Sequence, residues 1–352
     1  MPKKRGHLRF GLATVSVEPQ QAVEDGILAE KAGFDAIWVP DHIVDVNGDK
    51  LEPWTVLAAI AVQTKKVLLS PSVTDTQREH PSRTAHVATT LNHISKGRAI
   101  VGIGAGEAMN VVPYGLPWDE PAGRAARLEE AIRVIKLLYS SSREKMVSFK
   151  GSYYSLDRAF LSLRQYGPNP PPVYVGAMNA RTTLELTGRL GDGWFCWFNT
   201  PETFRRKWKI VEESARRAGR DPGAIESCSH LLMALPRNAE ERKAAMLGAK
   251  ATLLMERRTL ASMGYDLGEE LLQYQNFTIS KEYVASIMKA AADIPDEYVH
   301  RCMAVGTLED VERLVGEFEK AGIKHLVVAD FLAPATTKRT IRSLSKLIAA
   351  HR

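Results

Sequence analysis

Cysteine is scarce in this chain, and long apolar segments are missing. Only three cysteines, Cys196, Cys228 and Cys302, occur in 352 residues, and no two of them form a Cys-x-x-Cys pair. This spacing argues against a structural zinc site and favours a reducing compartment. No apolar run reaches the roughly 18 residues that a membrane-spanning helix needs. We therefore expect a soluble, cytoplasmic protein.

The short motifs of several common enzyme classes are also missing. The sequence contains no His-Glu-x-x-His zinc motif, no Gly-x-Ser-x-Gly nucleophile motif and no P-loop. His80, His86 and His93 do not fall at the spacing that would place metal ligands on one helical face. We expect no metal site.

The net charge of +6 is dispersed along the chain. The densest basic cluster, within residues 205–220, is interleaved with Glu212 and Glu213 on an expected helix, which is typical of a solvated helix face. No nucleic-acid motif accompanies it. The basic start of the chain imitates a signal peptide, but Arg9 and Gly11 interrupt the apolar stretch and no Ala-x-Ala site follows. We expect a first core strand there, and a small-molecule substrate rather than nucleic acid or a membrane as partner.

Strand and helix patterns alternate along most of the chain. Eight apolar segments read as strands: Leu8–Thr14, Asp35–Pro40, Val67–Val73, the run that begins at Arg98, Val173–Gly176, Gly193–Trp197, Ile225–Leu235 and Lys324–Phe331. The expected helices are Pro19–Ala32, Trp54–Gln63, Ser82–Ile94, Gly123–Tyr139, Arg181–Leu190, Pro201–Ala218, Leu308–Lys320 and Thr340–Ala350, with a long, mostly helical stretch from Ala239 to about Ala292.

This alternation predicts an α/β fold, a single (β/α)8 TIM-barrel domain over residues 1–352. Two insertions interrupt it, at about 142–172 and 250–300, and the aromatic and glycine content of the first predicts a hairpin. A doubly wound open sheet is the alternative, but it would usually have fewer units and a recognisable phosphate loop. In a barrel, the chemistry is expected at the C-terminal ends of the strands.

One segment stands out, the run RAIVGIGAGEAMNVVPYG from Arg98 to Gly115. A β-branched strand ends there in three glycines at alternate positions, Gly102, Gly104 and Gly106, followed by Glu107. It is not the dinucleotide fingerprint, because the third glycine comes one place early and no helix follows directly. It reads as a strand end that opens into a loop close to a ligand, although a tight turn would also need glycines.

The other strand ends supply polar residues. The second expected strand delivers Asp41 and His42, and a histidine with a carboxylate in one pocket can form an acid/base pair. The plainer alternative is that Asp41 and His42 only cap and orient the strand. The remaining strand ends offer Ser72, Val73, Thr74, Asp75 and Thr76; Gly104, Ala105, Gly106, Glu107 and Asn110; Gly176, Ala177, Met178 and Asn179; and Trp197, Phe198 and Asn199.

At these residues the chain resembles the bacterial luciferase-like barrel family, and within it the branch that uses the deazaflavin coenzyme F420. The resemblance lies in WVPDH, EPWT, SVTDTQREHP, GRAIVGIGAGEAMNVVPYG, VYVGAMNARTTLELTGRLGDGW and PETFRRKWKIVEESARRAGRDP. These segments span most of the first 222 residues, and residues 236–300 match poorly.

The resemblance implies a role for each of these residues. His42 would exchange a proton with the substrate oxygen while hydride passes to or from C5, and Glu107 would lie beside N1 of the ring. Asp41 is included as a catalytic residue because the strand-end pattern pairs it with His42. Ser72–Val73 would be a non-prolyl cis peptide against the back of the ring. Backbone amides of Gly104–Glu107 and Gly176–Met178 would hold the phosphate and ribityl parts. The implied coenzyme contacts are Asp41, His42, Ser72, Val73, Thr74, Gly104, Ala105, Gly106, Glu107, Asn110, Gly176, Ala177, Met178 and Trp197.

The implied function is an F420-dependent oxidoreductase that moves hydride between C5 and a carbonyl or secondary-alcohol carbon, or a related C=X carbon. Reduction of the methylenetetrahydromethanopterin type is an alternative, weakened because Phe10–Ser16 lacks the glutamate of that branch. Sugar-phosphate oxidation is not assigned either, because Lys250, Arg257 and Arg258 do not align with that branch's phosphate-binding residues. An FMN-dependent monooxygenase and a non-catalytic flavin-binding barrel stay open. The family also implies a homodimer or higher homo-oligomer.

Overall fold

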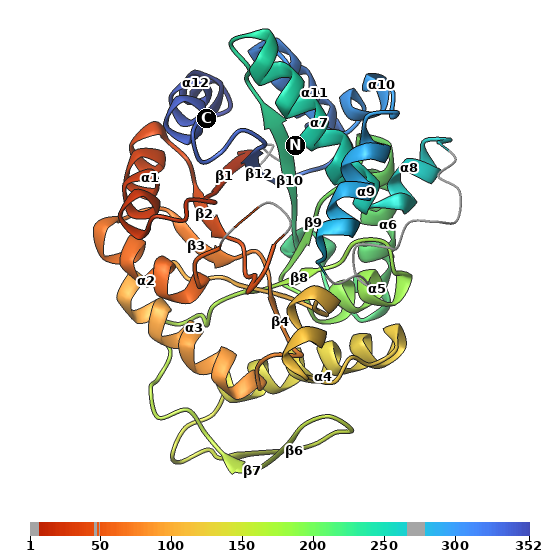
Figure 1. The fold of residues 1–352 in the computed structure, drawn as a ribbon. Helices are drawn as coiled ribbons and strands as arrows, with labels where there is room; N and C mark the ends of the chain where they lie inside the picture. The colour runs from red at the N-terminus through yellow and green to blue at the C-terminus, as the bar shows by residue number, and fades with distance from the viewer. Residues whose placement is uncertain (1–6, 46–47, 49, 266–278) are drawn as a thin grey trace.

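A ring of parallel strands forms the centre of the computed structural model, which describes residues 7–45, 48, 50–265 and 279–352 (Figure 1). The eight longer strands are β1 (Arg9–Ala13), β2 (Ala36–Val39), β3 (Leu68–Pro71), β5 (Val101–Gly104), β8 (Val173–Gly176), β9 (Gly193–Cys196), β10 (Glu226–Ala234) and β12 (His325–Asp330). Their order in the sheet is β3-β2-β1-β12-β10-β9-β8-β5. The predicted barrel is confirmed.

The ring closes where β3 meets the segment before β5. A parallel bridge joins Leu69 to Ala99, and the two-residue strand β4 (Thr74–Asp75) pairs with β5. Val67–Val73, predicted as one strand, is therefore interrupted: β3 pairs with β2, whereas β4 pairs with the strand on the other side. The Ser72–Val73 peptide between them is cis, which confirms the expectation from the family resemblance.

Helices surround the ring and return the chain to the start of each strand (Figure 1). The described α-helices are α1 (Pro19–Ala32), α2 (Pro53–Gln63), α3 (Pro81–Ser95), α4 (Pro121–Tyr139), α5 (Arg181–Leu190), α6 (Pro201–Arg217), α7 (Ala239–Met255), α8 (Arg257–Ser262), α9 (Lys281–Ala291), α10 (Asp296–His300), α11 (Leu308–Ala321) and α12 (Thr337–Ala350). Helices α1 to α4 and α6 begin with proline, whose fixed φ suits the first helical turn. Short 3₁₀ helices are η1 (Ala108–Asn110), η2 (Val112–Tyr114) and η3 (Pro222–Ala224).

The two predicted insertions differ in structure. Residues 142–172 contain the expected antiparallel hairpin, β6 (Val147–Lys150) and β7 (Ser155–Ala159), which projects from the barrel beyond α4 (Figure 1). The stretch from Ala239 to Ala292 is helical in its described part, and residues 266–278 of this prediction lie outside the described residues. The two-residue strand β11 (Ala304–Val305), which pairs with β10, was not predicted.

Aromatic side chains fill the barrel interior beneath the C-terminal strand ends. The rings of Trp38 and Phe195 stack with their centroids 4.7 Å apart, and Tyr174 packs beside Trp38. Further towards the N-terminal ends, Glu226 accepts hydrogen bonds from Arg9 and from the Tyr174 hydroxyl. The interior is therefore packed, and a ligand can enter only above this layer. No helix in the described part of the chain is long and apolar enough to cross a membrane.

Candidate functional site

A cavity of about 370 Å³ opens at the C-terminal ends of the strands. This volume is within the range of small-molecule sites. It is lined by every residue predicted to contact a coenzyme except Ala177: Asp41, His42, Ser72, Val73, Thr74, Gly104, Ala105, Gly106, Glu107, Asn110, Gly176, Met178 and Trp197. Ala177 packs into the layer beneath the helices instead, and its carbonyl accepts a hydrogen bond of 2.8 Å from Trp194 Nε1.

Two groups suited to acid/base chemistry meet at one side of this cavity. His42 Nδ1 lies 3.4 Å from Glu107 Oε2, and only 6% of the His42 side chain is exposed. Burial lowers the pKa of His42 to about 4, although Asp45, with its carboxylate 3.7 Å from Nε2, acts in the opposite direction. His42 is therefore a neutral imidazole near pH 7. The prediction that His42 and Glu107 share a pocket is confirmed.

Asp41, predicted to form an acid/base pair with His42, has its carboxylate next to Arg78. Its Oδ1 lies 2.9 Å from Arg78 Nη2, and the same guanidinium group pairs with Asp75. Burial raises the pKa of Asp41, and Arg78 opposes that shift. The Asp41 carboxylate therefore joins the end of β2 to the segment after β4 through Arg78, and its catalytic role stays a prediction.

Sequence reasoning did not assign Arg78. Its guanidinium group also donates to the Asp41 carbonyl at 3.2 Å, so one side chain joins two strand ends. The only sequence signal was its place inside the SVTDTQREHP segment, beside Asp75. That segment does not reveal that Asp41, 37 residues earlier, would be its partner.

Val73 projects between β5 and β8 because both strands carry glycine there. A methyl group on Gly104 would lie 3.0 Å from Val73 Cγ2, and one on Gly176 would lie 2.9 Å from the same atom. Gly106, by contrast, has φ +86°, a left-handed conformation that favours glycine. Gly104 and Gly176 thus make room for Val73, and Gly106 shapes the loop. The close approach of a ligand predicted for the glycines after β5 would be a further role.

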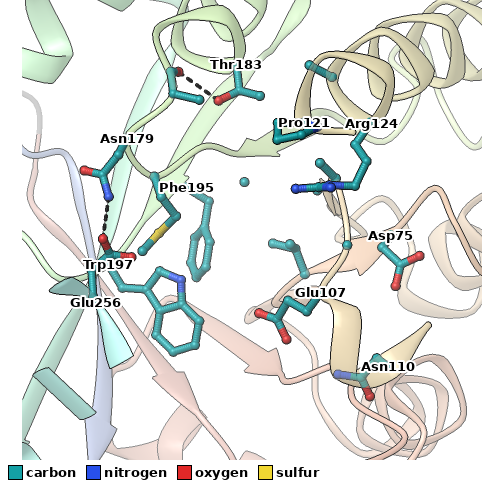
Figure 2. A pocket seen from close by; sticks show the side chains of 18 of the residues that line it. Asp75, Glu107, Asn110, Pro121, Arg124, Asn179, Thr183, Phe195, Trp197 and Glu256 are labelled. Atoms are coloured by element: carbon teal, nitrogen blue, oxygen red, sulfur yellow. Dashed lines mark hydrogen bonds between the residues drawn. The ribbon is translucent and has the colours of Figure 1, made fainter. Parts of the chain in front are cut away.

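Away from Glu107, the cavity reaches the N-termini of two helices and Arg124. Figure 2 shows Pro121 and Arg124 of α4 at one end of the cavity and Thr183 of α5 nearby. Neither helix has a side-chain cap at its N-terminus, so the first amides of α5 remain available for an anion. Arg124, Arg257 and Arg258 line the same cavity and add positive charge.

Of the basic residues named from the sequence, Arg257 and Arg258 reach the cavity, whereas Lys250 does not line it. Lys250 Nζ lies 2.6 Å from Asp296 Oδ1. Glu256, also missed from the sequence, lines the cavity and accepts a hydrogen bond of 2.7 Å from Asn179 Nδ2 (Figure 2). Burial raises the pKa of Glu256, with Lys207 and Arg258 opposing.

Asn110 lines the cavity as predicted, but its amide is directed to the protein. Its Oδ1 accepts hydrogen bonds from the backbone amides of Ile43 and Val44, and its Nδ2 faces His42 Nδ1 at 2.9 Å. A side-chain contact between Asn110 and a coenzyme, which the family resemblance implies, would have to compete with these hydrogen bonds for the same amide atoms. Asn110 instead orders the residues that follow β2.

The site thus combines a polar acid/base side, a bulge at Val73 with an aromatic wall at Phe195 and Trp197, and a cationic end. Figure 2 shows Glu107 and Trp197 on facing sides of the cavity. These surfaces fit a flat ring that carries an anionic tail. Within the described ranges, no three His, Cys, Asp or Glu side chains are grouped so that they could hold a metal ion.

Comparison with known proteins agrees with this architecture. The 5,10-methylenetetrahydromethanopterin reductase of Archaeoglobus fulgidus is 28% identical over 97% of this chain and 98% of its own length. The phthiodiolone/phenolphthiodiolone dimycocerosates ketoreductase of Mycobacterium bovis is 28% identical over 92% of each chain. The solved structure of an F420-dependent secondary alcohol dehydrogenase in complex with an F420-acetone adduct superposes with a TM-score of 0.82, at 26% identity, covering 98% of this chain and 99% of that one.

Residues 8–325 match the luciferase-like monooxygenase family. This match covers most of the barrel, from β1 to the first residue of β12. The chain therefore belongs to the luciferase-like monooxygenase family.

Proposed function

We propose that this protein is a coenzyme F420-dependent oxidoreductase that transfers hydride between the deazaflavin and a carbonyl or secondary-alcohol carbon. Similarity over nearly full length to the secondary alcohol dehydrogenase and to the ketoreductase supports both the coenzyme and this substrate class. The observation that carries the proposal is the buried, neutral His42 beside Glu107 at the edge of a cavity with a cationic far end.

The residues of the cavity fit F420 by their chemistry. The first amides of α5, together with Arg124, suit the phosphate of the coenzyme side chain. Val73 supports one face of a flat ring, and Glu107 offers a carboxyl group to its polar edge. When bound, the deazaflavin supplies or accepts the hydride at C5.

The protein's own task is then to handle the proton. In alcohol oxidation the substrate O–H must lose a proton as its carbon loses hydride, and in carbonyl reduction the oxygen must gain one. His42 is the group in position for both directions, because it lines the cavity and remains neutral near pH 7. The packed aromatic layer of Trp38 and Phe195 below the cavity closes it towards the barrel axis.

Two alternatives remain within the family. Reduction of the tetrahydromethanopterin type is supported by the similarity to the A. fulgidus reductase, but β1 carries no carboxylate from Arg9 to Ala13. An FMN-dependent monooxygenase is supported by the family match itself. A deazaflavin cannot support that oxygen chemistry, because carbon replaces N5, so coenzyme choice separates the two reactions.

The testing experiment is a titration of the purified protein with F420 and, separately, with FMN, followed by fluorescence. The proposal predicts saturable binding of F420 and weaker or no binding of FMN. Tight FMN binding without F420 binding would overturn it. His42→Ala should still bind F420 but lose hydride transfer; loss of transfer with binding retained excludes a non-catalytic flavin-binding barrel, and unchanged turnover would remove His42 from the mechanism.

The proposal also includes a single folding unit over residues 1–352 and a cytoplasmic location, both expected from the sequence pattern and composition, and a homodimeric or larger assembly, expected from the family resemblance. Analytical ultracentrifugation tests the assembly, and one calorimetric transition with equal calorimetric and van't Hoff enthalpies tests the single unit.

A further inference from the structure

Asn110 has an orientation that leaves no ambiguity about its two amide atoms. It sits at the end of η1 and is 2% exposed. Its Oδ1 accepts from the backbone N–H of Ile43 at 2.7 Å and of Val44 at 3.0 Å. Because a backbone N–H can only donate, the atom facing it must be the amide oxygen. The atom 2.9 Å from His42 Nδ1 is therefore the amide nitrogen, Nδ2.

This orientation determines which nitrogen of His42 carries the proton. An amide nitrogen can only donate, so Nδ1 must accept. In a neutral imidazole one nitrogen accepts and the other carries hydrogen, which places the proton on Nε2. The Asp45 carboxylate, 3.7 Å from Nε2, favours the same tautomer, whereas the Glu107 carboxyl, 3.4 Å from Nδ1, favours the other. The hydrogen bond from Asn110, at 2.9 Å the shortest of the three contacts, decides between them.

The charges around the ring keep it neutral as well. Burial is the main cause of the lowered pKa of His42, and Lys50 and Arg78 act in the same direction. Asp45 and Asp75 act against them, and Glu107 lies near Nδ1. The ring is therefore an uncharged imidazole with one fixed N–H group, at Nε2.

We propose that Asn110 is a positioning residue that holds His42 as the Nε2–H tautomer, so that the resting enzyme is prepared for reduction of a carbonyl group. The role in carbonyl reduction rests on the proposed function, whereas the tautomer of His42 follows from the hydrogen bonds of Asn110 alone. It also gives Asn110 a role other than the coenzyme contact implied by the family resemblance.

The chemistry balances for carbonyl reduction. The carbonyl carbon would gain the hydride that the reduced deazaflavin supplies from C5, and the electron pair of the C=O π bond would move to oxygen, which takes the proton from Nε2. The electron pair of the broken N–H bond stays on the ring, and water returns a proton to Nε2 after the alcohol leaves. A neutral imidazole N–H is an effective donor to a developing oxyanion. Alcohol oxidation needs an unprotonated Nε2, so it must first overcome the preference that Asn110 imposes.

The direct test is ¹⁵N NMR of the histidine rings in the coenzyme-free protein, with His42 identified by the signals lost in His42→Gln. We expect Nε2 to carry the proton and Nδ1 to give the resonance of an unprotonated ring nitrogen. Because no coenzyme is present, this result stands or falls independently of F420 binding. A wild-type ring protonated at Nδ1 would overturn the inference.

The matched variant is Asn110→Asp, which keeps an acceptor for Ile43 and Val44 but replaces the donor that faces Nδ1. We expect His42 to become protonated at Nδ1 in this variant, with its titration moved to higher pH. Reduction should slow by about tenfold or more at saturating ketone while KM for the ketone changes less than threefold. Asn110→Ser, which retains a hydroxyl donor, should recover part of the rate. An Asn110→Asp ring with wild-type tautomer and titration would contradict the proposal, whatever its activity.

Discussion

His42 Nδ1 and Glu107 Oε2 lie 3.4 Å apart, although 65 residues separate them in the chain. One follows β2 and the other follows β5, two strands that do not pair with each other. The contact exists because the strands of a closed barrel direct their C-terminal ends to one rim. It places an imidazole and a carboxyl group next to each other at one side of the cavity.

Glu107→Gln tests the second member of this pair. The amide keeps the shape of the side chain but loses its ability to ionise, so F420 should bind within a few-fold of wild type while hydride transfer slows by about a hundredfold. Rapid mixing of protein with F420 and substrate measures both. Glu317→Gln, an exposed carboxylate paired with Arg313 on α11, is the control and should change neither. Equal rates for Glu107→Gln and wild type would show that the carboxyl group is dispensable.

Gly176→Ala should disturb Val73. The added methyl group would lie 2.9 Å from Val73 Cγ2. Overpacking of this kind costs about 1–3 kcal/mol of unfolding free energy, measured with urea. Adding Val73→Ala should recover part of that loss, because alanine lacks the Cγ2 methyl group that the new methyl group would contact. Gly248→Ala in α7, where nothing lies within 4 Å, should be neutral or stabilising. If the unfolding free energy of the double variant does not recover, the loss in Gly176→Ala does not come from the contact with Val73.

Arg124→Gln should weaken F420 binding. Loss of a charged hydrogen-bond donor at the cationic end of the cavity corresponds to an increase of about ten- to a hundredfold in Kd. Arg127→Gln, one turn later on α4 and paired with Asp119, is the matched control because Arg127 does not line the cavity. Inorganic phosphate should compete with F420 in wild type. Similar losses in both variants would argue that α4 as a whole, and not Arg124, was affected.

Acidification should destabilise the protein through its buried histidines. Burial lowers the pKa of His42 to about 4 and that of His230 to about 3, below the value of about 6.5 in an unfolded chain. Between those values the unfolded state binds more protons, so stability is present above about pH 6.5 and is lost as pH falls towards the folded-state values. Urea unfolding at about pH 7 and about pH 5 measures this slope.

His230→Phe isolates one of these contributions. His230 packs against the rings of Phe195 and Trp197, where phenylalanine fits, and neither ring nitrogen of His230 has a hydrogen-bond partner among the described residues. The variant should therefore lose less stability on acidification than wild type. An unchanged slope would mean that His230 does not remain neutral in the folded protein.

Most of the barrel could be predicted from local patterns. Pro19–Ala32 and Val173–Gly176 were predicted with their observed bounds. The helix ends where Gly33 adopts φ 93°, a conformation that glycine favours, and the strand is a short β-branched run. Such signals are contained in a few neighbouring residues. The break at Ser72 cannot be seen in neighbouring residues, because it arises where the chain stops pairing with β2, as β3, and begins pairing with β5, as β4.

The site was predicted only in part, because local sequence patterns locate the strand ends but not the side-chain pairs between them. His42 and Glu107 lie at strand ends, so the fold brings them together once the barrel is assumed. Arg78 and Asn110 act through side-chain pairs that cross from one strand end to another, Arg78 with Asp41 and Asn110 with His42. Neither pair has a spacing that periodicity can detect. Glu256 was missed because it follows α7 in the segment that resembles the family least.

Transfer of deuterium from a labelled alcohol to the coenzyme would demonstrate the proposed reaction itself. The protein is incubated with F420 and a panel of short- and long-chain secondary alcohols deuterated at the carbinol carbon, and the coenzyme is then analysed by mass spectrometry and NMR. We predict one deuterium at C5 of the reduced deazaflavin for at least one alcohol, and none with His42→Ala. The account is contradicted if no alcohol, and no ketone in the reverse reaction, exchanges hydrogen with C5 while reduced FMN supports oxygen consumption by the same protein.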